Sequence, residues 1–460
     1  MRTRLSDMLK KLVVIISIGL LFSCGSSGGV GNQVELPAAT PPMGWNSWIC
    51  FGTSVTEDEV KANADYMAEH LKQYGWEYII IDAGWYAPGM VGLEEYESEH
   101  PYQLIDGYGR LRVDEEKYPS AVGGYGLKKL ADYIHSKGLK LGIHIMRGIP
   151  VQAVEENTPI KGTQYHASDI ADRNSRCEWY RGLYGVDMSK PGAQAYYDSL
   201  FELYASWGVD YVKADDLLSP VYAADEIEAV AEALDKCGRK MVLSLSPGPA
   251  PIENVRHMSK SSQLWRISED FWDDWESLKS QFDLCRKWQS HIIPGHWPDA
   301  DMLPIGPMAL RAMRGKPRTS NFTRDEQYTL MSLWAMFRSP LMLGCNLPEM
   351  DDFTMSLVTN AELIRINQAS ICNRELFARD GIIAWYAMDE ENDYHYLAVF
   401  NTTDDVIENY TLDLADIGII CNTADVTDVW TKEMETTNGK LDFDINPHGV
   451  KVLKINCLNK

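Results

Sequence analysis

Apolar and polar positions follow one repeating order along most of the chain: an amphipathic helix, a glycine and a short apolar run. Between residues 57 and 74, apolar side chains return at helical spacing. Gly75 then ends the predicted helix, and the apolar run 78–82 predicts a buried strand. Because buried parallel sheets are built from alternating helices and strands, this order predicts an α/β fold. The same order recurs at Gly138, Gly208 and Gly238.

Eight apolar runs in this part of the chain are candidate strands, and a (β/α)₈ barrel has eight. We therefore predict a TIM barrel over residues 37–370. An open, doubly wound sheet is the alternative, but the sequence has neither a G-x-G-x-x-G turn nor a Walker loop to favour it. The candidate strands are 43–48, 78–82, 141–145, 211–215, 241–246, 264–268, 291–294 and 341–345.

From about residue 371 the pattern changes, because long helical periods stop and short apolar runs are separated by polar turns. This spacing is typical of antiparallel sheets, so we predict a C-terminal β-sandwich over residues 371–460. No candidate chemistry is visible in it, which favours a supporting role. The predicted strands are 382–388, 395–400, 426–430 and 450–455.

The first 24 residues have the pattern of an export signal. Four basic residues precede an apolar run at 12–22 that is too short to span a bilayer as a helix. The following Leu-Phe-Ser-Cys resembles a bacterial lipobox, so we predict lipidation of Cys24 and a flexible Gly/Ser tether over 25–36. This predicts an exported protein of the bacterial cell envelope, attached to the membrane only through its lipid. An ordinary cleaved signal peptide is the alternative.

Composition narrows the possible partners. The formal net charge of −23 and the lack of a basic run argue against nucleic-acid binding. The cysteines form no C-x-x-C pair and no D-x-[DN]-x-[DN]-G loop is present, so we expect neither a metal nor a cofactor. The 14 Trp and 23 Tyr residues would suit the apolar faces of sugar rings, although packing accounts for many of them. The pattern leaves the oligomeric state open.

Polar residues stand where the predicted barrel strands end. Side chains at the carboxyl ends of barrel strands meet at one mouth, which is where TIM-barrel active sites lie. Several carboxylates in one mouth fit acid–base and nucleophilic work on sugars, with a Ca²⁺ or Mg²⁺ site as the competing interpretation. The residues at these ends are Asp82, His144, Asp215, Ser246, Asp270 and Asp301.

Lys213 and Asp215 are two positions apart on one predicted strand, so both point to the same side. A neighbouring ammonium would keep Asp215 ionised, as a nucleophile requires. The alternative is a buried ion pair without a catalytic role. Asp216 points the other way and is predicted to lie at the rim or behind the site.

The segment 41–48, Pro-Pro-Met-Gly-Trp-Asn-Ser-Trp, resembles the opening motif of glycoside hydrolase family 27, the α-galactosidases and α-N-acetylgalactosaminidases. Similarity continues in order through 81–82, 135–143, 207–215, 265–266 and 299–303. The resemblance implies a retaining exo-glycosidase that acts on an oligosaccharide or polysaccharide. It implies that Asp215 is the nucleophile and Asp270 the general acid/base. It assigns Asp82, Lys213, Arg266 and Asp301 to sugar binding and Trp48 to the pocket wall.

The chain departs from the family pattern where sugar hydroxyls are recognised. Ala83 follows Asp82 where the family usually has a second acid, His144 replaces a tyrosine, and Ser246 stands in a changed strand end. An inserted stretch at about 148–188 could build a different rim. We therefore expect α-galactosides or a related sugar. The alternatives are β-L-arabinopyranosides, α-N-acetylgalactosaminides, isomaltose-type α-glucosides, or an inactive glycan-binding lipoprotein, against which the two retained aspartates argue.

Overall fold

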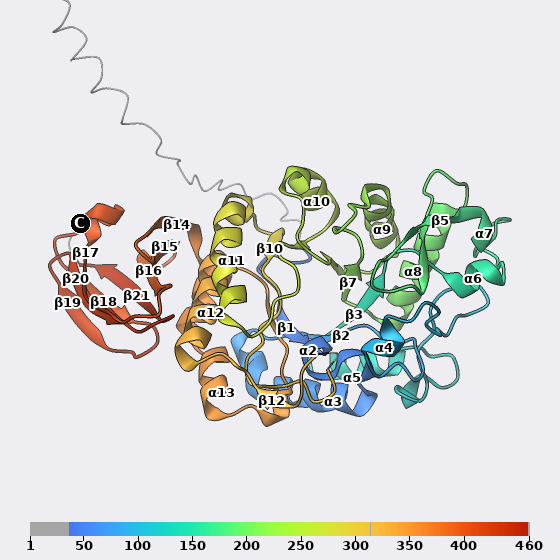
Figure 1. Ribbon diagram of the computed structural model, residues 1–460, viewed down its shortest axis with the longest axis horizontal. Helices are drawn as coiled ribbons and strands as arrows, with labels where there is room; N and C mark the ends of the chain where they lie inside the picture. Colours follow the sequence, from blue (N-terminus) through green and yellow to red (C-terminus); the bar gives the residue numbers. More distant parts are fainter. Residues whose placement is uncertain (1–35, 313, 459–460) are drawn as a thin grey trace, which may run out of the picture. The chain divides into compact units, whose positions relative to one another are not determined.

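The computed structural model describes residues 36–458 apart from residue 313, so the predicted signal peptide with Cys24 and nearly all of the tether lie outside the described residues. Eight parallel strands form one sheet in the order β10-β9-β8-β7-β3-β2-β1-β13 (Figure 1). They are β1 (Met43–Asn46), β2 (Tyr78–Ile81), β3 (Lys140–Met146), β7 (Tyr211–Asp215), β8 (Val242–Leu245), β9 (Leu264–Arg266), β10 (Trp297–Asp299) and β13 (Leu341–Leu343).

The sheet closes into a barrel between its two outer strands. Leu303, just beyond β10, forms a parallel bridge with Leu343 of β13. The backbone N–H of Leu303 donates to the carbonyl of Met342 at 2.7 Å, and that of Gly344 donates to the carbonyl of Leu303 at 3.2 Å. The predicted (β/α)₈ barrel is therefore confirmed.

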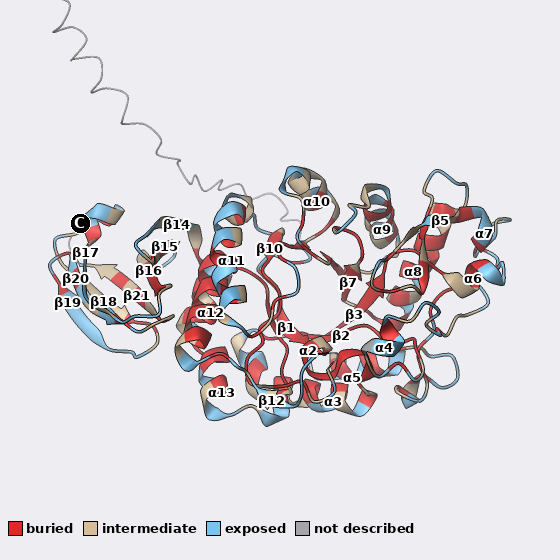
Figure 2. Cartoon of the chain, in the orientation of Figure 1, coloured by how far each residue is buried: buried red, intermediate tan, exposed pale blue. Residues whose placement is uncertain are grey.

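Helices cover the outside of the barrel. The helix α3 (Glu57–Tyr66) starts at a capping box in which Thr56 and Glu59 satisfy each other's backbone N–H groups. Gly208 ends α8 in the left-handed conformation that glycine adopts without strain, as its φ of 88° shows. Figure 2 shows the strands buried and the outer helix faces exposed. The other covering helices are α5 (Lys128–Ser136), α8 (Ala193–Trp207), α9 (Ala224–Lys236), α10 (Val255–Ser261), α11 (Trp275–Trp288) and α12 (Arg324–Phe337).

Seven predicted barrel strands coincide with observed ones, but the strand predicted at 291–294 is wrong. Ile293 and His296 exchange backbone hydrogen bonds across a Pro-Gly turn, and the actual strand follows at β10. The apolar Ile-Ile pair favours a strand at 291–294, whereas β10 has the sequence Trp-Pro-Asp and lacks an apolar run.

The stretch after β3 builds a small layer of its own. Strands β4 (Ile149–Pro150), β6 (Leu183–Val186) and β5 (Ala171–Arg176) pair in that order, with the short helices α6 (Val151–Glu155) and α7 (Ala167–Ile170) between β4 and β5. This three-stranded sheet occupies most of the insertion noted in the sequence.

Helix α14 (Ala361–Ala369) is followed at once by antiparallel strands that form two sheets, as predicted for a β-sandwich. The larger sheet has the order β14-β15-β16-β21-β18-β19, and β17 pairs with β20. Trp430 donates from its indole to the hydroxyl of Ser332 on α12 at 3.0 Å. In the described part of the chain, no helix has the length and apolarity to cross a bilayer. The strands are β14 (Ile371–Arg379), β15 (Ile382–Asp389), β16 (Tyr394–Asn401), β17 (Ile407–Asp413), β18 (Ala424–Asp428), β19 (Met434–Thr437), β20 (Lys440–Ile445) and β21 (Val450–Cys457).

Candidate active site

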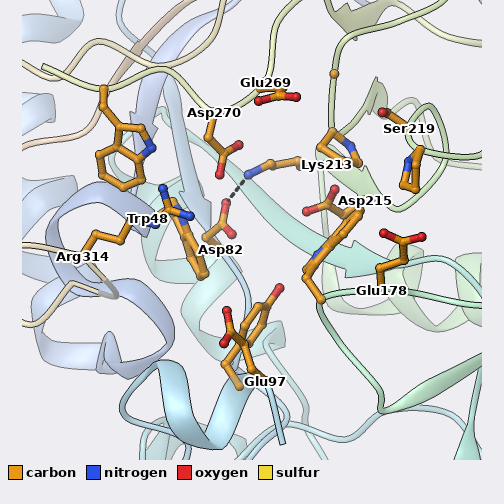
Figure 3. Close-up of a pocket in the computed structure, with 16 residues that line it drawn as sticks. Trp48, Asp82, Glu97, Glu178, Lys213, Asp215, Ser219, Glu269, Asp270 and Arg314 are labelled. Carbon is orange, nitrogen blue, oxygen red and sulfur yellow. Dashed lines mark hydrogen bonds and ion pairs between the residues drawn. The ribbon is translucent and has the colours of Figure 1, made fainter. Parts of the chain in front are cut away.

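A cavity of about 440 Å³ opens at the carboxyl ends of the barrel strands (Figure 3). Its volume suits a sugar ring and part of a second group. Five residues predicted from the sequence line it: Trp48, Asp82, Lys213, Asp215 and Asp270. The other lining residues are Tyr96, Glu97, Glu178, Trp179, Ser219, Pro220, Pro247, Gly248, Glu269, Trp272 and Arg314.

The floor of the cavity carries a buried ion pair. The ammonium of Lys213 lies 2.9 Å from Asp82 Oδ2, and the Asp82 side chain is 2% exposed. Asp82 also accepts hydrogen bonds from the Asn46 side chain at 2.8 Å and from the backbone N–H of Ala83 at 2.9 Å. Burial alone would raise the pKa of Asp82, but Lys213 and His144 hold it well below its usual range. Asp82 is therefore a fixed anion with both oxygens engaged.

Asp215 ends β7 and is held from two sides. His144 Nε2 lies 3.1 Å from its Oδ2, and the backbone N–H of Asp216 donates to its Oδ1 at 3.0 Å. Burial alone would raise the pKa of Asp215, but the hydrogen bond from His144 and the charges of His144 and Lys213 lower it. Asp215 is therefore ionised at neutral pH and oriented, as nucleophilic attack requires.

Asp270 follows β9 on a loop and is the most accessible of these carboxylates, with a side chain that is 51% exposed. Its Oδ1 lies 3.4 Å from the guanidinium of Arg266, which is itself buried. Arg266 makes its closer ion pair with Asp301, at 2.8 Å. Asp301 Oδ2 also accepts from the backbone N–H of Phe271, next to Asp270, at 2.8 Å. The Arg266–Asp301 pair thus fixes the loop that carries Asp270.

The remaining predicted residues lie beside or beneath this cavity. Ser246 is buried and, with Arg266 and Asp301, lines a cavity of about 20 Å³ in the barrel interior. His144 is 1% exposed and contacts Asp215, and it does not line the main cavity. Ala83, which stands where the family usually has an acid, is also buried and outside the lining. All nine predicted residues therefore gather at one end of the barrel, but at different depths.

Sequence reasoning missed most of the rim. Glu178 and Trp179 come from the stretch after β3, which the sequence analysis singled out only as a region. Trp272 and Arg314 come from loops, and the Arg314 guanidinium lies 5.4 Å from the Trp272 ring. Loop residues far apart in sequence leave no periodic pattern to find them by. Asp299 ends β10 and lines the cavity of about 20 Å³ inside the barrel, and it is not among the predicted residues because that strand was misplaced.

Among the described residues, 36–312 and 314–458, no group of three or more His, Cys, Asp or Glu side chains is arranged as a metal site. Two of the carboxylates at this end of the barrel form close ion pairs. Lys213 neutralises Asp82, and Arg266 neutralises Asp301.

Two family models match the chain. The alpha galactosidase A model matches residues 40–187 and 161–369, and the alpha galactosidase C-terminal beta sandwich model matches 380–455. The structure of a GH27 β-L-arabinopyranosidase from Geobacillus stearothermophilus is 46% identical, with a TM-score of 0.89 over 92% of this chain and 97% of that one.

More distant relatives include the alpha-galactosidase of Cyamopsis tetragonoloba, 28% identical over 420 residues, which are 90% of this chain and 85% of the relative. The alpha-N-acetylgalactosaminidase of Gallus gallus is 28% identical over 440 residues, or 90% of this chain and 92% of the relative. With the cavity at the expected end of the expected barrel, these matches show that the chain is a glycoside hydrolase that belongs to the alpha galactosidase A family, glycoside hydrolase family 27.

Proposed function

We propose that this chain is a retaining exo-glycosidase with Asp215 as the nucleophile and Asp270 as the general acid/base. The observation that carries the proposal is that both carboxylates line one cavity in contrasting environments. Asp215 is held by hydrogen bonds and has a lowered pKa, whereas Asp270 is half exposed on a loop. A nucleophile must be ionised and fixed, while an acid/base must exchange its proton with solvent between steps.

The proposed hydrolysis has two steps. In the first, Asp215 forms a bond to the anomeric carbon, the glycosidic bond breaks, and the proton of Asp270 passes to the leaving oxygen. In the second, Asp270 takes a proton from water, the water oxygen bonds to the anomeric carbon, and Asp215 leaves. Two inversions give net retention. The buried Asp82–Lys213 pair would accept and donate hydrogen bonds to the ring hydroxyls.

For the sugar, we propose a ring of the galactose arrangement, with β-L-arabinopyranosides preferred over α-D-galactosides. Ala83 stands where the family usually has a second acid, so the chain lacks one acceptor for the hydroxyl on the C6 arm of galactose. Arabinopyranose lacks that arm. The 46% identity to a β-L-arabinopyranosidase, against 28% to the alpha-galactosidase of Cyamopsis tetragonoloba, supports the same choice.

A panel of nitrophenyl glycosides tests the proposal directly. We expect the highest kcat/KM on the β-L-arabinopyranoside, a lower value on the α-D-galactoside, and little turnover of the α-N-acetylgalactosaminide or α-glucoside. NMR of the first-formed sugar should show the anomeric configuration of the substrate. An inverted product would contradict the mechanism, and a galactoside preference would contradict the sugar assignment alone.

We also propose that the protein is exported and anchored through Cys24. The support is the run of basic residues, the short apolar segment and the Leu-Phe-Ser-Cys sequence. Cys24→Ser should move the protein from the membrane fraction to the soluble fraction, because a Gly/Ser tether has no membrane affinity. Continued membrane association of this variant would contradict the anchor.

A further inference from the structure

Asp216, directly after Asp215, has a conformation that side chains rarely adopt. Its φ is 63°, in the left-handed region, which glycine enters more readily than residues with a Cβ. Its backbone N–H donates to Asp215 Oδ1, 3.0 Å away. The strained residue is therefore the one that holds an oxygen of the nucleophile.

A buried arginine holds Asp216 in this conformation. Arg147 Nε donates to the Asp216 carbonyl at 2.8 Å and to its Oδ2 at 3.0 Å, and another guanidinium nitrogen donates to Oδ2 at 2.7 Å. Arg147 also donates its backbone N–H to the carbonyl of Asp215 at 3.0 Å. One residue thus grips both members of the Asp215–Asp216 dipeptide.

The guanidinium is in turn fixed by two other elements. It donates to Glu226 of α9 at 2.7 Å and to the Ser175 hydroxyl of β5 at 2.9 Å. Glu226 also accepts from the hydroxyl of Tyr197 on α8 and from the backbone N–H of Val186 in β6. The side chains of Arg147, Asp216 and Glu226 are each only 7% exposed. Charges buried to this degree are expensive unless they are paired, and here Arg147 pairs with both carboxylates.

We propose that Arg147 and Asp216 are positioning residues for the nucleophile: the buried guanidinium locks Asp216 in the left-handed conformation, and its N–H sets the orientation of the Asp215 carboxylate. This rests on the proposed role of Asp215. The stretch after β3 then has a second role besides its place at the rim. Ser175 contacts Arg147 and Val186 contacts Glu226, and these contacts connect the stretch to the nucleophile.

A series at position 216 separates backbone conformation from side-chain anchoring. Asp216→Asn keeps an acceptor for Arg147 and tolerates the left-handed region. Asp216→Gly keeps the conformation but loses the anchor, and Asp216→Ala loses both. The activity should therefore fall in the order wild type, Asn, Gly, Ala. For the Ala variant the loss should be about tenfold to a hundredfold, as expected for a misplaced reacting group.

The readout is covalent labelling of Asp215 by a difluoro-sugar with a trinitrophenyl leaving group, made on the arabinopyranose and galactose rings. The first-order labelling rate at saturating probe should fall along the series. The concentration for half-saturation should stay constant, because the sugar-binding side chains are untouched. Unfolded molecules do not react, so the rate constant reports folded protein alone. A purely structural role would lower Tm and leave this rate constant unchanged.

Gly185→Ala perturbs the same arginine from the other side. A Cβ at Gly185 would lie 2.6 Å from both the Arg147 guanidinium and the Ser175 hydroxyl, so the methyl group must displace the arginine or its hydrogen-bond partner. We expect slower labelling in this variant too. If Asp216→Ala does not fold, Gly185→Ala carries the test together with the comparison of Asp216→Asn and Asp216→Gly. Asp389→Ala, which breaks a buried ion pair on β15, is the control for destabilisation and should label at the wild-type rate.

Peptide mapping keeps the two hypotheses apart. Label on another residue in the wild type would overturn the proposed nucleophile. Label on Asp215 with wild-type rates in the Asp216 and Gly185 variants would overturn the positioning role alone. Slowing of equal size in Asp389→Ala would also overturn it, because the loss would then follow general destabilisation.

Discussion

The mouth of the barrel and the interior of the C-terminal sandwich differ in how many charged side chains they bury. The mouth buries a set of acids and bases in close contact, including Asp82 with Lys213 and Arg266 with Asp301. The sandwich interior is filled mainly by apolar side chains such as Leu397, Val399 and Ile455, and the buried Asp389 of β15 forms an ion pair with Arg365 of α14. Buried charge lowers stability unless it is paired, so its concentration in one region marks where the fold serves chemistry.

The largest expected effect comes from removing the nucleophile at the mouth. Asp215→Ala should lower kcat by about ten-thousand-fold or more, because the covalent route is lost. Steady-state assays with the nitrophenyl arabinopyranoside measure this. Activity within tenfold of the wild type would contradict the assignment, and Asp216 would then need to be tested by peptide mapping.

Removing the proposed acid/base should have a smaller effect that depends on the substrate. Asp270→Ala should slow substrates with poor leaving groups by about a hundredfold to ten-thousand-fold, since protonation then limits the reaction. An activated aryl glycoside should still form the glycosyl-enzyme. Added azide should restore turnover, because it attacks without a base. Absence of azide rescue on every substrate would favour the neighbouring Glu269 instead.

Lys213→Met tests how much the ion pair between Lys213 and Asp82 contributes to stability. The free energy of unfolding should fall by about 3–5 kcal/mol at pH 7, because Asp82 is left as a buried anion without its cation. The lowered pKa of Asp82 contributes stability above the unfolded value near 4, and this is lost as pH falls through the folded pKa. The deficit of the variant should therefore shrink in acid. Urea denaturation at pH 7 and below pH 4 measures it, and an equal deficit at both would exclude charge as the cause.

Asp299 should give the opposite pH dependence. Burial is the main cause that raises its pKa to about 6, although Arg266 opposes it. Stability should therefore decrease as pH rises from about 4 to 6, where the unfolded state is ionised and the folded state still holds the proton. Asp299→Asn should remove up to about 3 kcal/mol of this decrease. A variant with the wild-type slope in urea titrations would show that another group is responsible.

The smallest effect is expected in the sandwich. Asp389 is 2% exposed and pairs with Arg365 of α14 at 2.5 Å. Burial opposes ionisation, but the hydrogen bonds from Arg365 and Asn392 lower its pKa to about 2. Asp389→Ala should cost roughly 2 kcal/mol at neutral pH, a loss that fades between about pH 4 and 2. The kcat of the folded enzyme should be unchanged, and a change would mean that the sandwich influences the mouth.

The barrel was predictable because its signals are local. A capping box, helical periodicity and a terminal glycine around α3 locate one unit, and repetition locates the rest. The strand-end rule then brought Asp82 and Asp215 to one site. The placement of the strand failed at β10, where Trp-Pro-Asp carries no apolar run and the Ile292–Ile293 pair lies in a turn. Short strands fixed by their neighbours leave little trace in sequence.

The contacts of the site were less predictable than its members. Asp216 was placed at the rim or behind the site, but nothing in the sequence identified Arg147 as its partner, since the two are 69 positions apart. The rim residue Trp272 lies on a loop, where periodicity gives no guidance. Sequence patterns thus identify residues on regular elements, while long-range polar contacts and loops require the folded chain.

The closure of the barrel has a consequence for motion. Within the described residues, one β-bridge, Leu303–Leu343, joins the two sides of the seam, whereas β3 and β7 pair continuously from Gly142–Tyr211 to Met146–Asp215. Amide hydrogens near the seam should therefore exchange with solvent sooner than those around β7. The backbone N–H of Phe271 donates to Asp301, two residues before Leu303, so the loop of Asp270 is hydrogen-bonded to the segment that forms the seam. If Asp215 and Asp270 act as we propose, amide protection should be greater at the end of β7, which carries Asp215, than in the loop that carries Asp270.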